Sequence, residues 1–201
     1  MSERKFSIVL MIIGALVVSA GLSVASIGYL GQSNAYVGWK WVNQGRIKSP
    51  ASLSKLSFPS LHREFFVMEG ATQRNLLLGP AYVGGSVKPG ENGNCVIAAH
   101  RDTHFRILKD VQKGDEISVD WTGKSFRYQI TSLAIVPAED ARYYQHEGAA
   151  LLTLVTCYPF YYVGPAPKRF IVRARLIESS QNTRPSGSLN TTCLAFTNSY
   201  L

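Results

Sequence analysis

The chain has 201 residues, and 21 lysines and arginines against 13 acidic residues give a formal net charge of +8. The basic excess is uneven: residues 1–63 carry seven basic residues and one acidic residue (+6), and residues 64–201 carry fourteen and twelve (+2). Because the larger part is nearly neutral and has no basic-aromatic binding motif, the composition argues against a nucleic-acid partner.

The N-terminal part predicts a membrane anchor. A short flank, residues 1–5, precedes an apolar run over residues 6–31 that contains no charged side chain. About 20 helical residues span a hydrocarbon core of about 30 Å, and the run is longer than that. A cleaved signal peptide, the alternative, would have a shorter apolar region and a small-residue cleavage site. We therefore expect an uncleaved transmembrane helix.

The segments that flank the central part of the chain are polar. Residues 32–63 are expected to form a juxtamembrane stalk, in which Trp39 and Trp41 suit either the membrane interface or packing on the domain. Residues 179–201 are rich in turn-forming residues and weakly patterned, which predicts a mobile C-terminal tail.

The segment between them, residues 64–178, is long enough for one hydrophobic core and has strand-like patterns. The sequence alternates apolar and polar residues at 126–130 (FRYQI). At 170–177 (FIVRARLI), a strand would place the apolar residues 170, 172, 174 and 176 on one face and Arg173 and Arg175 on the other. Continuous apolar runs at 95–99 (CVIAA) and 151–156 (LLTLVT) predict central strands that are buried on both faces.

Turn signals complete the expected architecture. The TGK sequence at 122–124 separates two strand-like runs and predicts a hairpin. Pro137 opens PAEDARYYQ, with acidic residues in its first turn, which predicts one helix. Short strands separated by Gly- and Pro-containing loops favour an all-β barrel or sandwich with few helices.

Three residue types with acyl-transfer chemistry lie at the ends of predicted strands. Cys157 ends one apolar run, His100 follows another, and Arg169 begins a third strand. A thiol attacks a carbonyl as the thiolate, which a nearby imidazolium or guanidinium stabilises. A guanidinium also suits a developing oxyanion, because it keeps its charge. If the strands are neighbours, the three side chains can meet at one rim of the barrel.

The sequence motifs around these residues resemble those of the sortases. The resemblance rests on three motifs: TLVTC (153–157), an AxH strand end at 98–100 and KRFIV (168–172). It extends over residues 64–178 and is strongest to the sortases of marine proteobacteria. It implies an eight-stranded β-barrel with one or two short helices behind an N-terminal transmembrane helix. It also implies a cysteine transpeptidase that cleaves a C-terminal LPxTG-like sorting signal through a thioacyl-enzyme and passes the acyl group to an amine.

The resemblance assigns roles to the matching residues. Cys157 would be the nucleophile, and His100 would protonate the leaving amine and deprotonate the acceptor. Arg169 would hold the substrate and stabilise the oxyanion, with Arg173 as its competitor. Thr156 would support the site. The family usually has glycine before this histidine, where this chain has Ala99, a substitution that we expect to be tolerated in a β conformation.

The aromatic loop after the cysteine is expected to form one wall of the substrate groove, with Tyr158 and Phe160 as substrate-binding residues. The implied partners are a surface protein that carries a sorting signal and an amine acceptor, which the sequence leaves open among a peptidoglycan amine, a lysine and water. The implied location is the plasma or inner membrane, with the barrel outside the cytoplasm. No cofactor is expected. His100 and His104 have helical metal-ligand spacing, but no third ligand is evident, so no metal is expected either.

Several alternatives remain open at this point. The chain could be another cysteine peptidase or a non-catalytic, membrane-anchored barrel that binds a surface protein. Asp102 could orient His100, although a turn or cap role suits it better. Cys95 suits a core position, or a redox disulfide with Cys157, and Cys193 is a lone thiol in the tail.

Overall fold

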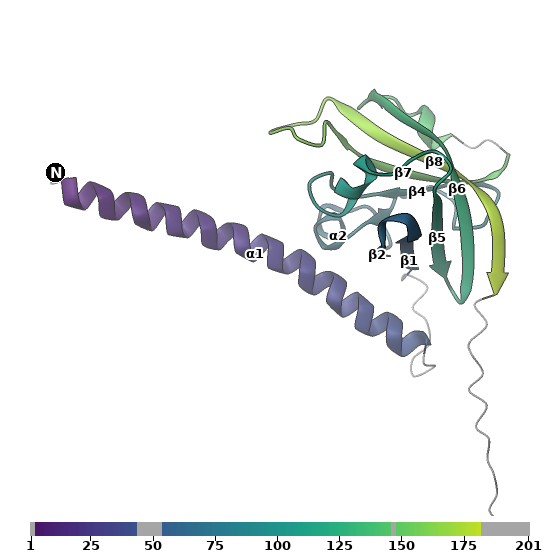
Figure 1. Cartoon of the computed structure of the whole chain (residues 1–201), viewed down its shortest axis with the longest axis horizontal. Coiled ribbons are helices and arrows are strands. Elements are labelled where there is room, and N and C mark those ends of the chain that lie inside the picture. Colours follow the sequence, from purple (N-terminus) through teal and green to yellow (C-terminus); the bar gives the residue numbers. More distant parts are fainter. Residues whose placement is uncertain (1–2, 44–53, 146–147, 182–201) are drawn as a thin grey trace, which may run out of the picture.

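The computed structural model describes residues 3–43, 54–145 and 148–181, which form a long helix and an eight-stranded sheet (Figure 1). The α-helices are α1 (Glu3–Asn43) and α2 (Gln73–Leu78). The short 3-10 helices are η1 (Pro59–Leu61), η2 (His104–Lys109) and η3 (Arg142–Tyr144). The strands are β1 (Ser54–Phe58), β2 (Arg63–Val67), β3 (Ala81–Tyr82), β4 (Gly93–Ala98), β5 (Glu116–Trp121), β6 (Lys124–Pro137), β7 (Ala150–Tyr158) and β8 (Lys168–Gln181).

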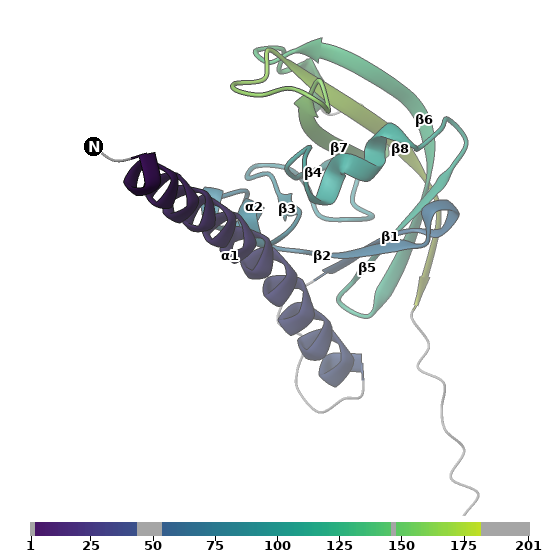
Figure 2. The same cartoon turned by 60° about the vertical axis from the view of Figure 1, so that its left-hand side comes forward.

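The sheet curls into a nearly closed barrel with the strand order β2-β1-β5-β6-β8-β7-β4-β3 (Figure 2). Its two edges meet at Met68, whose N–H donates to Pro80 O and whose carbonyl accepts from Tyr82 N, both at 2.9 Å. These bonds satisfy backbone groups that an open edge would leave unpaired. The predicted eight-stranded barrel is confirmed.

The long hairpin of β5 and β6 forms where the sequence predicted it. Trp121 pairs with Lys124, so Thr122 and Gly123 make a two-residue turn. Both have positive φ, 48° and 78°, which is the conformation that matches the twist of the two strands.

The two continuous apolar runs form central strands, as predicted. β4 and β7 pair in parallel, while the other strand pairs within the described residues are antiparallel. Alternate residues such as Leu152 and Leu154 enter the barrel interior, and Val155 faces a smaller outer cluster with Val96 and Ile171. Both faces of these strands are therefore covered, which explains their lack of polar alternation.

Segment η2 closes one mouth of the barrel and lies across it in Figure 2. Its Phe105 and Leu108 are fully buried in the interior core. The Phe105 N–H donates to His100 O at 3.0 Å, so the turn that follows His100 is fixed by the same packing.

The boundary that was predicted at residue 64 is wrong. β1 begins at Ser54 and pairs with both β2 and β5, so the end of the expected stalk is a barrel strand. Lys55 occupies an outer position, where its ammonium pairs with Glu64 at 2.9 Å and Asp120 at 3.5 Å. The sequence around Lys55 was interpreted as a linker because the carboxylates that pair with this lysine lie on other strands.

The helix that was predicted from Pro137 is also wrong. β6 continues to Pro137, which pairs with Lys168, and η3 is a single turn. The Asp140 carboxylate accepts from the backbone N–H and the guanidinium of Arg142 at 3.0 Å, which stabilises a local turn in place of a helix.

The terminal segments extend differently from the prediction. α1 continues past residue 31 to Asn43, and among the described residues no helix combines the length and apolar character needed to cross a membrane. β8 includes residues 179–181 of the expected tail. Residues 182–201, with Cys193, and the side chains of Trp39 and Trp41 lie outside the described part.

The C-terminal half of helix α1 contacts the barrel through the side chains of Gln32 and Tyr36. Gln32 Oε1 accepts from Phe66 N at 2.9 Å, and its Nε2 donates to Leu78 O at 2.9 Å and to Phe66 O at 3.3 Å. The Tyr36 ring lies edge-on to the Phe66 ring at 6.2 Å. The glutamine thus occupies the hydrogen-bonding groups that β2 would otherwise expose.

Candidate active site

Cys157 and Arg169 face each other across two neighbouring strands. Cys157 is the penultimate residue of β7, Arg169 is the second residue of β8, and the two are direct partners in the antiparallel register. Directly opposite residues of such a pair have Cβ atoms about 4.5–5.5 Å apart and side chains on the same face. The thiol and the guanidinium therefore share one end of the sheet.

The segment that leads to His100 runs along β7 on the side opposite β8. The parallel register of β4 and β7 ends with Ala98 opposite Val155, and Ala99 N continues it by donating to Val155 O at 3.2 Å. The Thr156 hydroxyl donates to Ala99 O at 2.8 Å. The next residues in this register are His100 and Cys157, so all three predicted catalytic residues come to one strand end.

The alternation of side chains places this site on the outer face of the barrel. Thr156 is buried toward the interior, whereas Val155 and Ile171 pack outside against Tyr143. Cys157 and Arg169 have the same parity as Val155 and Ile171, so they share their face. Cys157 and Arg169 lie at one strand end and on the outer face, and the predicted meeting of the His100 side chain with them stays a prediction.

The guanidinium of Arg169 is held by backbone carbonyls at the end of the β7–β8 loop. Its Nη1 donates to Ala166 O at 3.2 Å and to Lys168 O at 3.1 Å. Arg173, the competing arginine, pairs with Thr153, four residues from Cys157 and hence about 13 Å along the strand. The register thus places Arg169, and not Arg173, next to the thiol.

Tyr158 and Phe160 pack together at the end of the barrel. The Tyr158 and Phe160 rings lie 5.8 Å apart, and Phe160 lies 5.3 Å from Phe170 and packs against the interior core. This packing gives the predicted substrate-binding pair a structural role, and their contact with substrate stays a prediction. The most exposed side chains of the loop are instead Tyr161 (72%) and Val163 (99%).

Two arginines hold this loop from the segment that follows His100. Arg101 Nη2 donates to Tyr162 O at 2.7 Å and to Gly164 O at 3.1 Å, and its guanidinium lies 5.6 Å from the Tyr162 ring centre. Arg106 stacks over the Tyr161 ring at 5.0 Å. The sequence analysis missed both residues, because nothing local marks an arginine whose partners are distant in the chain: backbone carbonyls for Arg101 and an aromatic ring for Arg106.

His104 is the first residue of η2, four residues after His100. Its ring lies edge-on to the Phe65 ring at 5.9 Å, and its Nδ1 is 3.2 Å from the Thr103 hydroxyl oxygen. Burial, together with the nearby His100, lowers the pKa of His104 below its ordinary value. Within the described ranges, no group of three or more His, Cys, Asp or Glu side chains is placed to hold a metal ion.

Cys95 is separated from the site. It pairs with Leu152, five residues from Cys157 on β7, which corresponds to about 16 Å along the strand. Bridged cysteines have Cα atoms less than about 7 Å apart, so a Cys95–Cys157 disulfide does not fit this fold. Cys95 is buried in the interior core, and burial raises the pKa of its thiol to about 12.

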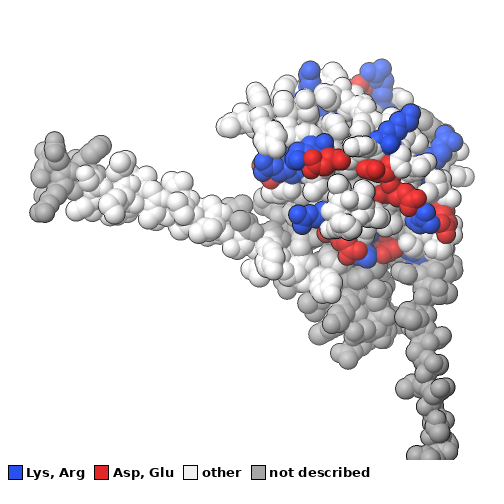
Figure 3. Space-filling model, in the orientation of Figure 1, with Lys and Arg blue, Asp and Glu red and all other residues white. Residues whose placement is uncertain are grey.

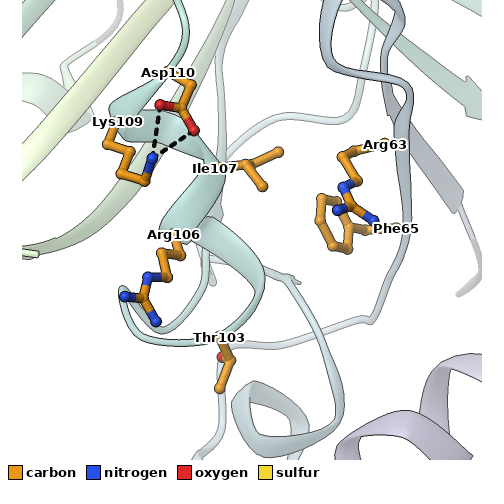
Figure 4. Close-up of a pocket in the computed structure, with 7 residues that line it drawn as sticks. All are labelled: Arg63, Phe65, Thr103, Arg106, Ile107, Lys109 and Asp110. Atoms are coloured by element: carbon orange, nitrogen blue, oxygen red, sulfur yellow. Dashed lines mark hydrogen bonds and ion pairs between the residues drawn. The ribbon is translucent and has the colours of Figure 1, made fainter.

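A hollow of about 340 Å³ lies between β2 and η2 (Figure 4). Phe65 and Ile107 line it with apolar surface, and Thr103 lies at one end. The charged side chains that line it are Arg63, Arg106, Lys109 and Asp110. On the face of the barrel shown in Figure 3, basic and acidic side chains are interspersed, so that face carries no broad region of one sign.

Comparison with known proteins shows the family. The model of the Sortase domain matches residues 56–177, which is more than half of the chain. Sortase D of Bacillus subtilis (strain 168) is 37% identical over 124 residues, covering 61% of this chain and 62% of its own length. Sortase A of Bacillus anthracis is 27% identical over 129 residues, covering 62% and 60%. The matches therefore span about three fifths of these curated relatives.

Solved structures agree with the fold. The catalytic domain of B. anthracis SrtD is 31% identical with a TM-score of 0.57, covering 67% of this chain and 92% of that one. Streptococcus pneumoniae Sortase C is 26% identical with a TM-score of 0.60, covering 67% and 70%. The likeness to marine proteobacterial sortases stays a prediction. The family match, on a barrel that brings cysteine, histidine and arginine to one strand end, shows that this chain belongs to the sortases, which are cysteine transpeptidases.

Proposed function

We propose that this protein is a membrane-anchored transpeptidase that uses Cys157, His100 and Arg169 to transfer a sorting-signal peptide to an amine. The observation that carries the proposal is the strand register, in which Cys157 lies opposite Arg169 on one side and beside the His100 segment on the other. The three groups have complementary tasks in acyl transfer: a nucleophile, a proton carrier and a fixed positive charge.

The proposed reaction has two acyl-transfer steps. The Cys157 thiolate attacks the carbonyl carbon of the scissile peptide bond, and Arg169 stabilises the resulting oxyanion. His100 donates a proton to the leaving amine as the C–N bond breaks, which leaves a thioacyl-enzyme. An acceptor amine then attacks the thioester and gives a proton to His100, and Cys157 leaves as the thiolate. No net oxidation occurs, and the enzyme is regenerated.

The substrate in this proposal is a surface protein with an LPxTG-like signal near its C-terminus. The β7–β8 loop, whose exposed tip includes Tyr161, Tyr162 and Val163, is the candidate wall that contacts this peptide. The acceptor is an amine. An apolar tip next to a nucleophile suits a peptide with an apolar residue.

Membrane anchoring is part of the same proposal. Its support is the uncharged apolar run over residues 6–31, which lies in helix α1. We propose that this helix anchors the barrel on the outer side of the plasma or inner membrane. Membrane fractionation and protease access to spheroplasts test this, and a barrel that is released by a salt wash or protected in spheroplasts contradicts it.

The first test of the activity uses the full chain in detergent, a panel of LPxTG-type peptides, and hydroxylamine as a neutral acceptor. We expect a thioacyl adduct on Cys157 by intact mass and a peptide hydroxamate by mass spectrometry. Cys157→Ala abolishes both products, while His100→Ala and Arg169→Ala each reduce them by at least about a hundredfold. Wild-type protein that binds a peptide without an adduct or cleavage would instead indicate a non-catalytic binding barrel.

A further inference from the structure

We propose that the hollow between β2 and η2 binds a carboxylate that is carried by the amine acceptor. This inference rests on the transpeptidase function proposed above and adds a recognition site for the second substrate. The hollow is lined by Arg63 from β2 and by Arg106, Lys109 and Asp110 from η2 and the residue that follows it. Figure 4 shows Arg63 across the hollow from the η2 residues.

The hollow carries positive charge that the protein does not neutralise. The Lys109 ammonium pairs with Asp110 at 2.7 Å, which accounts for the single acid in the lining. Among the described residues, no carboxylate lies within ion-pair distance of Arg63 or Arg106. Two guanidiniums thus border an apolar floor made by Phe65 and Ile107.

Three other cations on the barrel surface are paired with acids. Lys88 contacts Glu69 at 2.6 Å, Arg127 contacts Glu116 at 3.0 Å, and Lys55 contacts Glu64 at 2.9 Å. In the described part of the chain, Arg63 and Arg106 have no such acid partner, and both line one hollow. A planar guanidinium binds a carboxylate with two parallel hydrogen bonds, so the two free guanidiniums suit that ligand.

Two chains of contacts connect the hollow to the segments that follow His100 and Cys157. Phe65, in its lining, packs edge-on against His104 at 5.9 Å, and His104 is close enough to His100 for the charge of one to lower the pKa of the other. Arg106 lines the hollow and also stacks over Tyr161, in the loop that follows Cys157.

This position suits the acceptor. The acceptor amine must reach the thioester beside His100, which takes its proton. An acceptor that approaches from the His100 side passes His104, and an anionic group further along its chain then reaches the hollow. An extended chain spans about 3.3–3.6 Å per residue, so acceptor peptides of three and five residues test two different lengths. The chemical class is therefore an amine with a carboxylate several bonds away.

The test compares acceptors that differ only in the carboxylate. Full-length protein, acylated by whichever peptide of the panel forms the thioacyl-enzyme, is given triglycine or triglycinamide, and pentaglycine or its amide. Hydroxylamine, which has no anionic group, measures the acyl chemistry independently. The variants are Arg63→Gln, Arg106→Gln and the double variant. Arg74→Gln, an exposed arginine on α2 outside the hollow, is the matched control.

We expect wild-type protein to favour the acid over the amide by about twofold to fivefold in kcat/KM, the range of a solvent-accessible charge pair. Arg63→Gln weakens this preference and keeps its hydroxylamine rate, the double variant loses the preference, and Arg74→Gln keeps both the preference and the rate. Arg63→Lys retains part of the preference, and Arg63→Glu reverses it. Because each variant is compared by its acid-to-amide ratio, differences in amine basicity cancel.

Two results overturn the inference while the proposed function stands. One is equal use of acid and amide by the wild-type protein at both peptide lengths. The other is an acid preference that survives in the double variant. Absence of a hydroxamate product with every peptide of the panel is a different failure. It removes the transpeptidase function itself, and the acceptor site with it.

Discussion

Thr156→Val removes one buried hydroxyl and keeps the shape of the side chain. The hydroxyl donates to Ala99 O at 2.8 Å, and Thr156 is only 2% exposed. Valine leaves that carbonyl without this donor in a place that water does not reach. A buried polar group that loses its partner costs about 1–3 kcal/mol in the free energy of unfolding.

This cost translates into a measurable shift in Tm. Unfolding entropy is about 2.1 cal/mol/K per residue, so a domain of about 120 residues loses about 4 °C per kcal/mol. We therefore expect the Tm of Thr156→Val to fall by about 4–12 °C. Differential scanning calorimetry on the full chain measures the shift.

The same substitution is expected to slow catalysis. The bond joins the residue before Cys157 to the residue before His100, so its loss loosens the alignment of the two reacting groups. A displacement of about 1 Å can cost about a hundredfold in rate. We expect kcat for hydroxamate formation to fall by about tenfold to a hundredfold at 20 °C, with little change in KM.

Thr153→Val is the matched control for this experiment. The Thr153 hydroxyl is also fully buried and donates to Asn94 Oδ1 at 2.7 Å, but Asn94 in turn donates to Tyr143 O and not to the His100 segment. It should therefore lose similar stability and retain most of its kcat. Equal losses of kcat in both variants, or an unchanged kcat in Thr156→Val, would refute the alignment argument.

Three further predictions concern single side chains. At pH 8, iodoacetamide should modify Cys157 and leave Cys95 unlabelled, because a buried thiol of pKa about 12 is about one part in ten thousand thiolate; peptide mapping that finds equal labelling contradicts this. The His104 ring protons should titrate by NMR with a midpoint below 6.5. Because the fold favours neutral His104, stability present above pH 6.5 is lost as the pH falls through the lowered pKa, a dependence that His104→Gln should reduce. Arg101→Ala should speed hydrogen exchange at residues 161–164 and raise the KM for the peptide more than it lowers kcat, and an unchanged KM would count against the loop contact.

The strand pattern was readable in the sequence because it is a local property. β8 alternates apolar and basic residues from Val172 to Leu176, and β4 and β7 show continuous apolar runs, since each residue's face follows from its position in the strand. The two-residue turn at Thr122 and Gly123 was equally local. The short motifs that contain Cys157, His100 and Arg169 also indicated the family, because each motif is a contiguous stretch of the chain.

Other features depended on residues that are distant in the chain. The polar sequence of β1 was interpreted as a linker because the residues that pair with it lie on other strands, β2 and β5. The helix that was predicted after Pro137 does not form there because β6 continues to Pro137 and pairs with β8. Strand periodicity alone offered no reason to prefer Arg169 over Arg173, because both arginines lie on the same face of the strand. The register separates them, since a shift of four residues moves a side chain about 13 Å.

The fold class, the family and the set of residues with acyl-transfer chemistry could therefore be obtained from the amino-acid sequence alone, because they follow from local periodicity and from contiguous motifs. Tertiary structure was needed to establish which face carries the site, that Cys95 is too far from Cys157 to bridge it, how Arg101 holds the loop, and where unpaired arginines border a hollow. These depend on distances between segments that lie 40 or more residues apart in the chain, and the closure of the barrel sets those distances.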